Sequence, residues 1–322
     1  MGILKRVKQA MPEFGEQSRI VAENYGGSPL RWIFDMAWCL LRYGARPIDY
    51  ARFNFQKKSS RERNRYLTIF RYFRIKKHFG AGTLGVCGKV EEYRTFGSFI
   101  QRDWMDINKC TSLSSINEFI AQHKEVIAKP VNGEQGKGVL LIKSIGSQEY
   151  DNLLSGIKTS SYVLEEKVTN CAEIAMINPS SLNTVRVTTL IEKDGTSRIM
   201  SIILRVGAPG AHVDNWGAGG VGYNFDIETG VCNMYGRDKK NRPYIYHPGS
   251  NIQMLGFKLP RFEDLKKYVI SLTKIFPSAR YVGWDIAITP NGFDLIEMNC
   301  PAGHDMFQSF DNPVYDLMMR NW

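Results

Sequence analysis

A predicted strand pair near the C-terminus constrains the fold of this chain most. Two apolar runs, 282–289 and 293–298, flank a Pro-Asn-Gly turn and are expected to form a β-hairpin. Asp285 interrupts the first run, and Glu297 and Asn299 occupy alternate positions of the second, so both face one side. A charge inside an apolar strand is costly unless it is paired or bound to a metal. Because oxygen ligands suit Mg²⁺, the three side chains are predicted to bind this ion.

A glycine-rich turn is the second informative feature. Residues 133–138 separate two predicted strands, 126–131 and 139–143. Glycines let backbone N–H groups approach phosphate oxygens closely, and Lys129 on the entering strand could meet a phosphate. The same pattern is compatible with an ordinary hairpin that carries a solvent-facing lysine. The turn residues singled out as phosphate-binding candidates are Gly136, Lys137 and Gly138.

The rest of the chain predicts an α+β protein. Helices are expected after the capping patterns that begin at Ser28, at Ser59 and at Ser115, and over 262–276. Asp294, between the metal candidates, is expected to be a turn residue. Further strands are predicted at 162–166, 185–192 and 198–206. We expect two units, a basic and mainly helical N-terminal region over 1–80 and a main domain over 81–322.

The net positive charge of the chain arises in its N-terminal quarter. The chain has a net charge of +10, but residues 1–80 alone carry 17 Lys or Arg against 6 Asp or Glu. A basic extension on a nearly neutral body suggests contact with an anionic membrane or glycan, whereas nucleic acid is less favoured. A solvated basic helix face is the simpler alternative. We expect a cytoplasmic protein with peripheral contact at the inner membrane face.

Several enzyme classes are disfavoured by the motifs. The glycine patterns at 80–85 and 217–222 lack the strand before and the helix after that a dinucleotide site needs. The loop at 133–138 lacks the spacing of a Walker A motif. The five histidines form no HExxH pattern, and no GxSxG motif occurs, which disfavours zinc hydrolases and serine hydrolases. Arg186 begins a predicted strand, where either phosphoryl stabilisation or a structural salt bridge is compatible with the sequence.

Taken together, these features resemble the ATP-grasp superfamily over roughly 84–310. Lys89 and Lys129 stand 40 residues apart, like the two phosphate-binding lysines of that family, and 133–138 resembles its phosphate lid. The segment 162–168 resembles the hinge strand that holds adenine. The resemblance further implies nucleotide contacts at Glu165, Glu166, Val168 and Glu173, a phosphoryl-steadying role for Arg186, and magnesium binding, with two ions, at Asp285, Glu297 and Asn299.

Finer motifs are similar to a branch called sugar-transfer-associated ATP-grasp proteins, related to alpha-L-glutamate ligases. These motifs are SLNTVRV, VDNWGAGGVG, VGWDIAIT and LIEMNCPAGHDMFQ. The resemblance implies a fold with two α+β subdomains that clasp ATP. It also implies a carbon–nitrogen ligase that forms an acylphosphate and joins an amine to a uronic-acid-type carboxylate in polysaccharide assembly. Acceptor recognition is expected at Arg205, His212, Asp214 and Asn215.

Two alternatives stay open at this point. The same metal and phosphate groups would serve an ATP-dependent kinase that acts on a sugar or small-molecule hydroxyl. A nucleotide-binding scaffold without turnover is a third possibility, although a scaffold has no need of a full metal site. The usual α/β N-terminal domain of the dipeptide ligases is not recognisable in this sequence, so the substrate does not follow from the resemblance.

Overall fold

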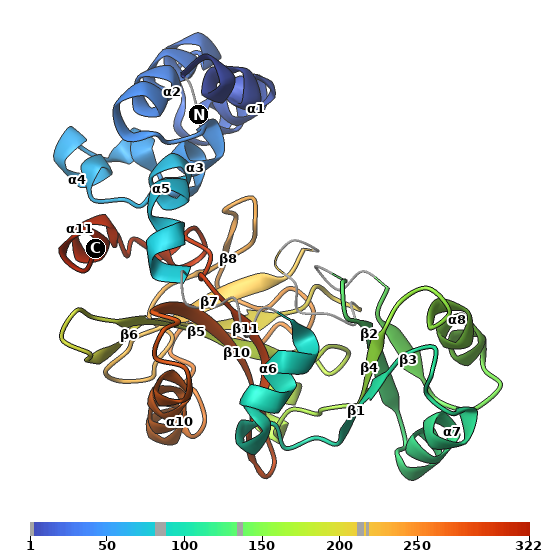
Figure 1. Cartoon of the computed structure of the whole chain (residues 1–322). Coiled ribbons are helices and arrows are strands. Elements are labelled where there is room, and N and C mark those ends of the chain that lie inside the picture. Colours follow the sequence, from blue (N-terminus) through green and yellow to red (C-terminus); the bar gives the residue numbers. More distant parts are fainter. Residues whose placement is uncertain (1–2, 81–87, 134–137, 211–215, 217–218) are drawn as a thin grey trace.

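The computed structural model of the chain describes residues 3–80, 88–133, 138–210, 216 and 219–322 (Figure 1). These residues form helices and two antiparallel sheets, so the predicted α+β class is confirmed. The α helices are α1 Ile3–Tyr25, α2 Pro29–Tyr43, α3 Pro47–Arg52, α4 Ser60–Asn64, α5 Ile69–Gly80, α6 Lys89–Thr95, α7 Leu113–Gln122, α8 Gln148–Gly156, α9 Ala172–Ala175, α10 Phe262–Ile275 and α11 Tyr315–Arg320. The strands are β1 Trp104–Ile107, β2 Val126–Pro130, β3 Leu140–Ile142, β4 Tyr162–Glu166, β5 Thr184–Ile191, β6 Ser197–Val206, β7 Val221–Phe225, β8 Gly236–Arg237, β9 Pro243–Tyr244, β10 Tyr281–Thr289 and β11 Gly292–Asn299.

The small sheet has the order β1-β4-β2-β3, and every neighbouring pair is antiparallel. Helices α7 and α8 cover it and share its apolar core. The cap predicted at Ser115 is wrong, because α7 begins three residues earlier. Ser112 is the N-cap, and its Oγ accepts a hydrogen bond of 3.1 Å from the backbone N–H of Ser115. The serine nearer the start of the apolar run therefore takes the capping position.

The large sheet has the order β11-β10-β5-β6-β7-β8-β9 and is also antiparallel throughout. All nine residues of β10 are buried, which explains why this segment is an almost continuous apolar run. Helix α10 packs on one face of the sheet. The end of α5, the 3₁₀ turn Phe307–Phe310 and α11 pack on the other face, and Figure 1 shows α10 and α5 on opposite sides.

The N-terminal helices have a core of their own, which consists mainly of aromatic side chains from α2, α3 and the segment that follows. Helix α2 begins and ends where predicted: Ser28 accepts a hydrogen bond from the N–H of Arg31, and Gly44 ends the helix at φ 67°. The predicted capping box of Ser59 and Glu62 is also present at the start of α4. None of the helices that the described residues form is both long enough and apolar enough to cross a lipid bilayer.

The N-terminal helices are tied to the C-terminal segment. The amide of Gln308 donates to the carbonyl of Leu67 and accepts from its N–H, at 2.9 and 2.8 Å. Arg52 forms an ion pair with Asp305. In Figure 1, α5 leads from these helices to the large sheet, and the C-terminal helix α11 lies beside it. The N-terminal helices and the C-terminal segment, far apart in sequence, are therefore in direct contact.

Candidate active site

Asp285 lies on β10, next to the edge strand of the large sheet, where β11 and β5 flank it. Its carboxylate is 1% exposed and forms a two-pronged ion pair with Arg186 on β5, whose Nη2 lies 2.7 Å from Oδ2. Arg205 on β6 adds a third contact, 3.1 Å from the same oxygen. Burial disfavours the charged form of Asp285, but the two guanidinium groups hold the pKa of this carboxyl below its usual value.

Glu297 lies directly across the hairpin from Asp285, and Asn299 pairs with Gly283 two positions away. The pairing register shifts between Asp285 and Ile286, so Asp285 pairs with Glu297 whereas Ile286 pairs with Leu295. The Nδ2 of Asn299 donates to Asp285 over 3.4 Å. The Glu297 side chain reaches solvent. Partial burial and then the negative charge of Asp285 raise the pKa of Glu297, although Arg186 and Lys129 oppose this rise.

A buried ion network joins the small sheet to the large one. Arg102 donates through Nε to Glu165 on β4, at 2.7 Å, and through Nη1 to Asp294 on β11, at 2.6 Å. The ammonium of Lys129 on β2 also pairs with Glu165, and the Tyr93 hydroxyl donates to the same carboxylate. The prediction that Asp294 is a turn residue is wrong. It lies buried in β11, where its charge is compensated by Arg102.

Glu92 on α6 is a buried carboxyl beside this network, and the motif analysis did not single it out. Its Oε1 accepts the backbone N–H of Met298 at 2.5 Å, which fixes α6 against β11 between the metal candidates. Burial and the charge of Glu297 raise the pKa of Glu92 to about 8, against the smaller opposing effects of the Met298 N–H and Lys129. The side chain is therefore largely protonated near neutral pH. Figure 1 shows α6 beside the β10–β11 hairpin.

Lys89 stands at the first position of α6 and reaches the base of the glycine-rich loop. Its ammonium donates to the carbonyl of Gly133 at 2.6 Å. Gly138, at the far end of the loop, has a φ of +76°, and a Cβ there would lie 3.2 Å from the ring of Pro130. A glycine is therefore needed at this position for its backbone conformation. The structure brings Lys89 to the loop and Lys129 to the carboxylate network.

The remaining predicted nucleotide residues lie around the end of β4. Glu165 and Glu166 are neighbours on this strand, so their side chains point to opposite faces. Glu165 enters the buried network, whereas the exposed Glu166 lies with Asp103 and His123, with ligand atoms within 4.8 Å of one another. Val168 is half-buried just beyond β4. Glu173 is exposed on α9, whose start is hydrogen-bonded to the carbonyl of Ile288 on β10.

Arg205 is the acceptor-recognition candidate that the structure places, and its guanidinium contacts Thr184 and Asp285. The other predicted candidates lie outside the described residues. They are Gly136 and Lys137 of the glycine-rich loop, and His212, Asp214 and Asn215.

Sequence reasoning missed Glu92 and Arg102. Glu92 is one of two adjacent glutamates in a seven-residue helix, and so short a helix has no periodicity that would separate them. Arg102 stands in a loop between α6 and β1, and only its distant partners reveal its role. Both residues depend on contacts between segments at least sixty positions apart.

The donor set at the hairpin fits a hard divalent cation. Asp285 is already paired with Arg186, so its burial alone does not demand a metal. Glu297, however, offers a solvent-accessible carboxylate opposite Asp285, and Asn299 retains its amide oxygen because its nitrogen bonds Asp285. Nearby Lys129, Arg186 and Arg205 would attract phosphate oxygens. The site thus places oxygen ligands for a divalent cation beside positively charged side chains that suit phosphate.

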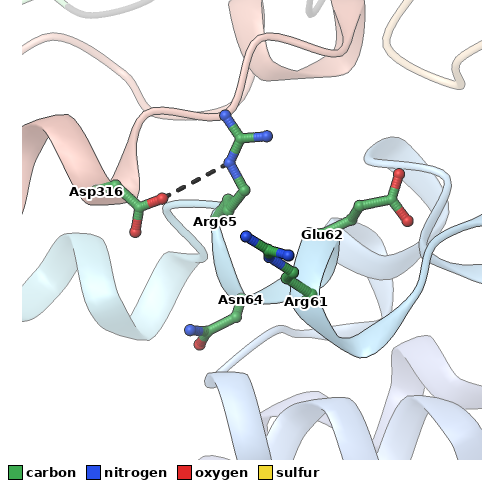
Figure 2. Close-up of a pocket in the computed structure, with 5 residues that line it drawn as sticks. All are labelled: Arg61, Glu62, Asn64, Arg65 and Asp316. Carbon is green, nitrogen blue, oxygen red and sulfur yellow. Dashed lines mark ion pairs between the residues drawn. The ribbon is translucent and has the colours of Figure 1, made fainter.

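A separate hollow lies between α4 and α11 (Figure 2). It has a volume of about 450 Å³, and an ion pair of 3.6 Å joins Arg65 to Asp316 at its edge. Its lining residues are Arg61, Glu62, Asn64, Arg65 and Asp316. They include none of the predicted site residues, so the hollow is not part of the candidate active site.

Comparison with protein families gives a match over residues 93–313, to the family described as sugar-transfer associated ATP-grasp. A comparison with curated protein sequences gives no match. Similar solved structures include a D-alanine–D-alanine ligase from Coxiella burnetii, with 11% identity, a TM-score of 0.46 and coverage of 73% of this chain and 56% of the ligase. Another is the ATP-grasp ligase PsnB in complex with a precursor peptide and AMPPNP, with 13% identity, a TM-score of 0.44 and coverage of 83% and 68%. A third, the ADP complex of an N5-carboxyaminoimidazole ribonucleotide synthetase, has 11% identity, a TM-score of 0.45 and coverage of 68% and 45%.

Proposed function

The chain belongs to the sugar-transfer-associated ATP-grasp family, and from this premise we propose that it is an ATP-dependent carbon–nitrogen ligase. In the proposed reaction, a substrate carboxylate attacks the γ-phosphorus of ATP, which releases ADP and forms an acylphosphate. An amine then attacks the acyl carbon, and inorganic phosphate leaves as the amide forms. The protein contributes positioning and charge neutralisation to these steps.

The assignment of roles rests on the charges around the β10–β11 hairpin. Glu297 and Asn299, with Asp285, would hold magnesium, for which we propose two ions that neutralise the ATP phosphates. Lys129 and Lys89 would bind phosphate oxygens, and Arg186 would steady the transferred phosphoryl group. Support for this proposal comes from the ion pair of Arg186 with Asp285, which lies opposite Glu297 across the hairpin. The charges of Lys129 and Arg186 also oppose the rise in the pKa of Glu297. The two cations therefore act electrostatically on the candidate metal ligand.

For the substrates we propose a glycan carboxylate of the uronic acid type and an amino acid or amine, in surface polysaccharide assembly. The family description refers to sugar transfer, which supports a glycan but does not name it. Arg205 would recognise the acceptor carboxylate. A lipid-linked glycan would bring the reaction to the inner membrane face, where residues 1–80 supply a surplus of eleven positive charges.

Hydroxylamine distinguishes a ligase from a kinase. It traps an acylphosphate as a hydroxamate, so the purified chain with ATP, Mg²⁺, a uronate and hydroxylamine should release ADP and give the iron-complex colour of a hydroxamate. Glucose in place of glucuronate is the matched control and should give neither. A stable phosphorylated sugar without hydroxamate would favour the kinase, and ADP release that no uronate-plus-amine pair changes would exclude this substrate class.

A further inference from the structure

Helix α2 has two apolar faces, and only one of them is covered. Trp32, Met36 and Leu40 point into the N-terminal helical core. On another side of the same helix, Leu30 is 66% exposed, Phe34 75%, Trp38 57% and Leu41 64%. At 100° per residue, these four positions fall within an arc of about 80° and form a continuous stripe. We call these four residues the outer stripe of α2.

The outer stripe contributes little to the fold and is costly to expose to water. Isolated apolar side chains on a protein surface are ordinary, but a contiguous patch of large ones marks a docking surface. The stripe includes a phenylalanine and a tryptophan that both remain more than half exposed. The helix needs only its opposite face to pack, so the stripe calls for a separate explanation.

Positive charge borders the stripe. Arg31 and Arg42 are exposed, and helical geometry places both next to Trp38 at the edge of the arc. The acidic residue on this side, Asp35, is compensated by Arg63 at 2.7 Å and by the hydroxyl of Tyr50 at 2.6 Å. The stripe therefore has a cationic border, within a region of strong positive charge.

We propose that the outer stripe docks on an anionic membrane surface, with α2 lying in the plane of the interface. The apolar side chains would enter the boundary between headgroups and acyl chains, Trp38 would lie at headgroup level, and Arg31 and Arg42 would meet lipid phosphates. The proposal specifies the peripheral contact suggested for residues 1–80 and does not depend on the ligase reaction.

A second copy of the chain fits the stripe less well. Each of the four side chains has at most about 250 Å² of surface, so the stripe offers on the order of 500 Å² at these exposures. A stable dimer buries roughly 800 Å² per partner. An antiparallel two-fold contact through α2 would also bring Arg31 and Arg42 of both copies together, whereas an anionic surface compensates them.

Vesicle sedimentation with the full chain tests the proposal. The wild type should bind vesicles of phosphatidylcholine and phosphatidylglycerol in a 7:3 ratio, and at least tenfold more weakly vesicles of phosphatidylcholine alone. The double variant Phe34→Ser/Trp38→Ser should lose tenfold or more of the affinity for anionic vesicles. Arg31→Gln/Arg42→Gln should lose most of the preference for anionic lipid and its salt dependence. Leu113→Ser, which removes a 52% exposed leucine from α7, is the matched control and should bind as the wild type does.

The outcomes separate lipid from other occupants. Circular dichroism and ADP release with soluble substrates should be the same in the stripe variants and the wild type, which would confirm that the fold and the active site are intact. Equal binding of wild type and Phe34→Ser/Trp38→Ser, or no binding of the wild type to anionic vesicles, would overturn the proposal. A dimer in light scattering that Phe34→Ser/Trp38→Ser dissociates, without lipid binding, would instead assign the stripe to a second copy.

Discussion

At the residue scale, the site depends on how each buried charge is compensated. The sequence shows that Asp285 interrupts an apolar strand, and from this a metal ligand was predicted. The structure adds Arg186 and Arg205, from two neighbouring strands, as partners of the same carboxylate. Two guanidinium groups keep this carboxylate in its ionised form, which is the form that binds a metal ion. Asp285 thus has a structural role whatever its part in metal binding.

Replacement of Asp285 by Asn should destabilise the fold strongly. The amide keeps the shape of the side chain but removes the negative charge that compensates Arg186 and Arg205. We expect a loss of about 3 kcal/mol in the free energy of unfolding, measured by urea denaturation. The control is Glu263→Gln, which breaks the exposed pair with Lys266 on α10 and should cost less than about 1 kcal/mol. Equal losses in both variants would contradict this role of Asp285.

At the element scale, most strands follow from the sequence, but fewer of the helices do. The strands at β4, β5, β6, β10 and β11 were predicted to within one residue at each end, since β-branched runs bounded by turns are strong signals. The helices that were not predicted are α1, α3, α6, α8, α9 and α11, and α7 begins before the predicted cap. A helix as short as α6 is held by tertiary contacts, such as the bond from Met298 to Glu92, that local sequence does not encode.

The contact between α6 and β11 should make stability depend on pH. The pKa of Glu92 is about 8 in the folded protein but about 4.5 for an unperturbed glutamate, so the folded chain binds more protons between these values. Stability should therefore fall as pH rises from 4.5 to 8. The Glu92→Gln side chain cannot ionise, so the variant should have nearly the wild-type stability at pH 5 but should be more stable at pH 8.5, by at most roughly 5 kcal/mol. Urea denaturation at the two pH values tests this, and a pH-independent difference between variant and wild type would contradict it.

At the scale of the whole molecule, the two sheets are joined by charge. Arg102 reaches Glu165 in the small sheet and Asp294 in the large one, and all three groups are almost fully buried. The family resemblance implied two α+β subdomains, but the sequence could not show this connection, because the partners lie 63 and 192 positions from Arg102. The metal candidates were predictable because they lie within fifteen residues of one another. The two lysines proposed to bind phosphate, Lys89 and Lys129, were indicated by family spacing, whereas the residues that position them were not.

Removal of the charge at Arg102 should loosen the link between the sheets. Arg102→Met roughly preserves the length of the side chain but leaves the buried Asp294 without its cation and Glu165 with Lys129 as its ion-pair partner. We therefore expect a loss of about 3 kcal/mol in the free energy of unfolding. Arg102→Lys should recover only part of this loss, because an ammonium cannot bond two carboxylates in a fork. Hydrogen exchange should show faster exchange in β1 and β4 in particular. Equal exchange rates of β1 and β4 in the variant and the wild type would argue against a role of Arg102 in joining the two sheets.

We propose that the β10–β11 carboxylates bind Mg²⁺ for ATP chemistry, and the variant Glu297→Gln tests this proposal. This side chain is exposed, so its amide should leave the unfolding midpoint within a few degrees of the wild type. Loss of a metal ligand should lower the rate of ADP release at saturating Mg²⁺ and ATP at least a hundredfold. A folded Glu297→Gln protein with undiminished ADP release would rule out Glu297 as a magnesium ligand. We expect a folded protein that has lost ADP release.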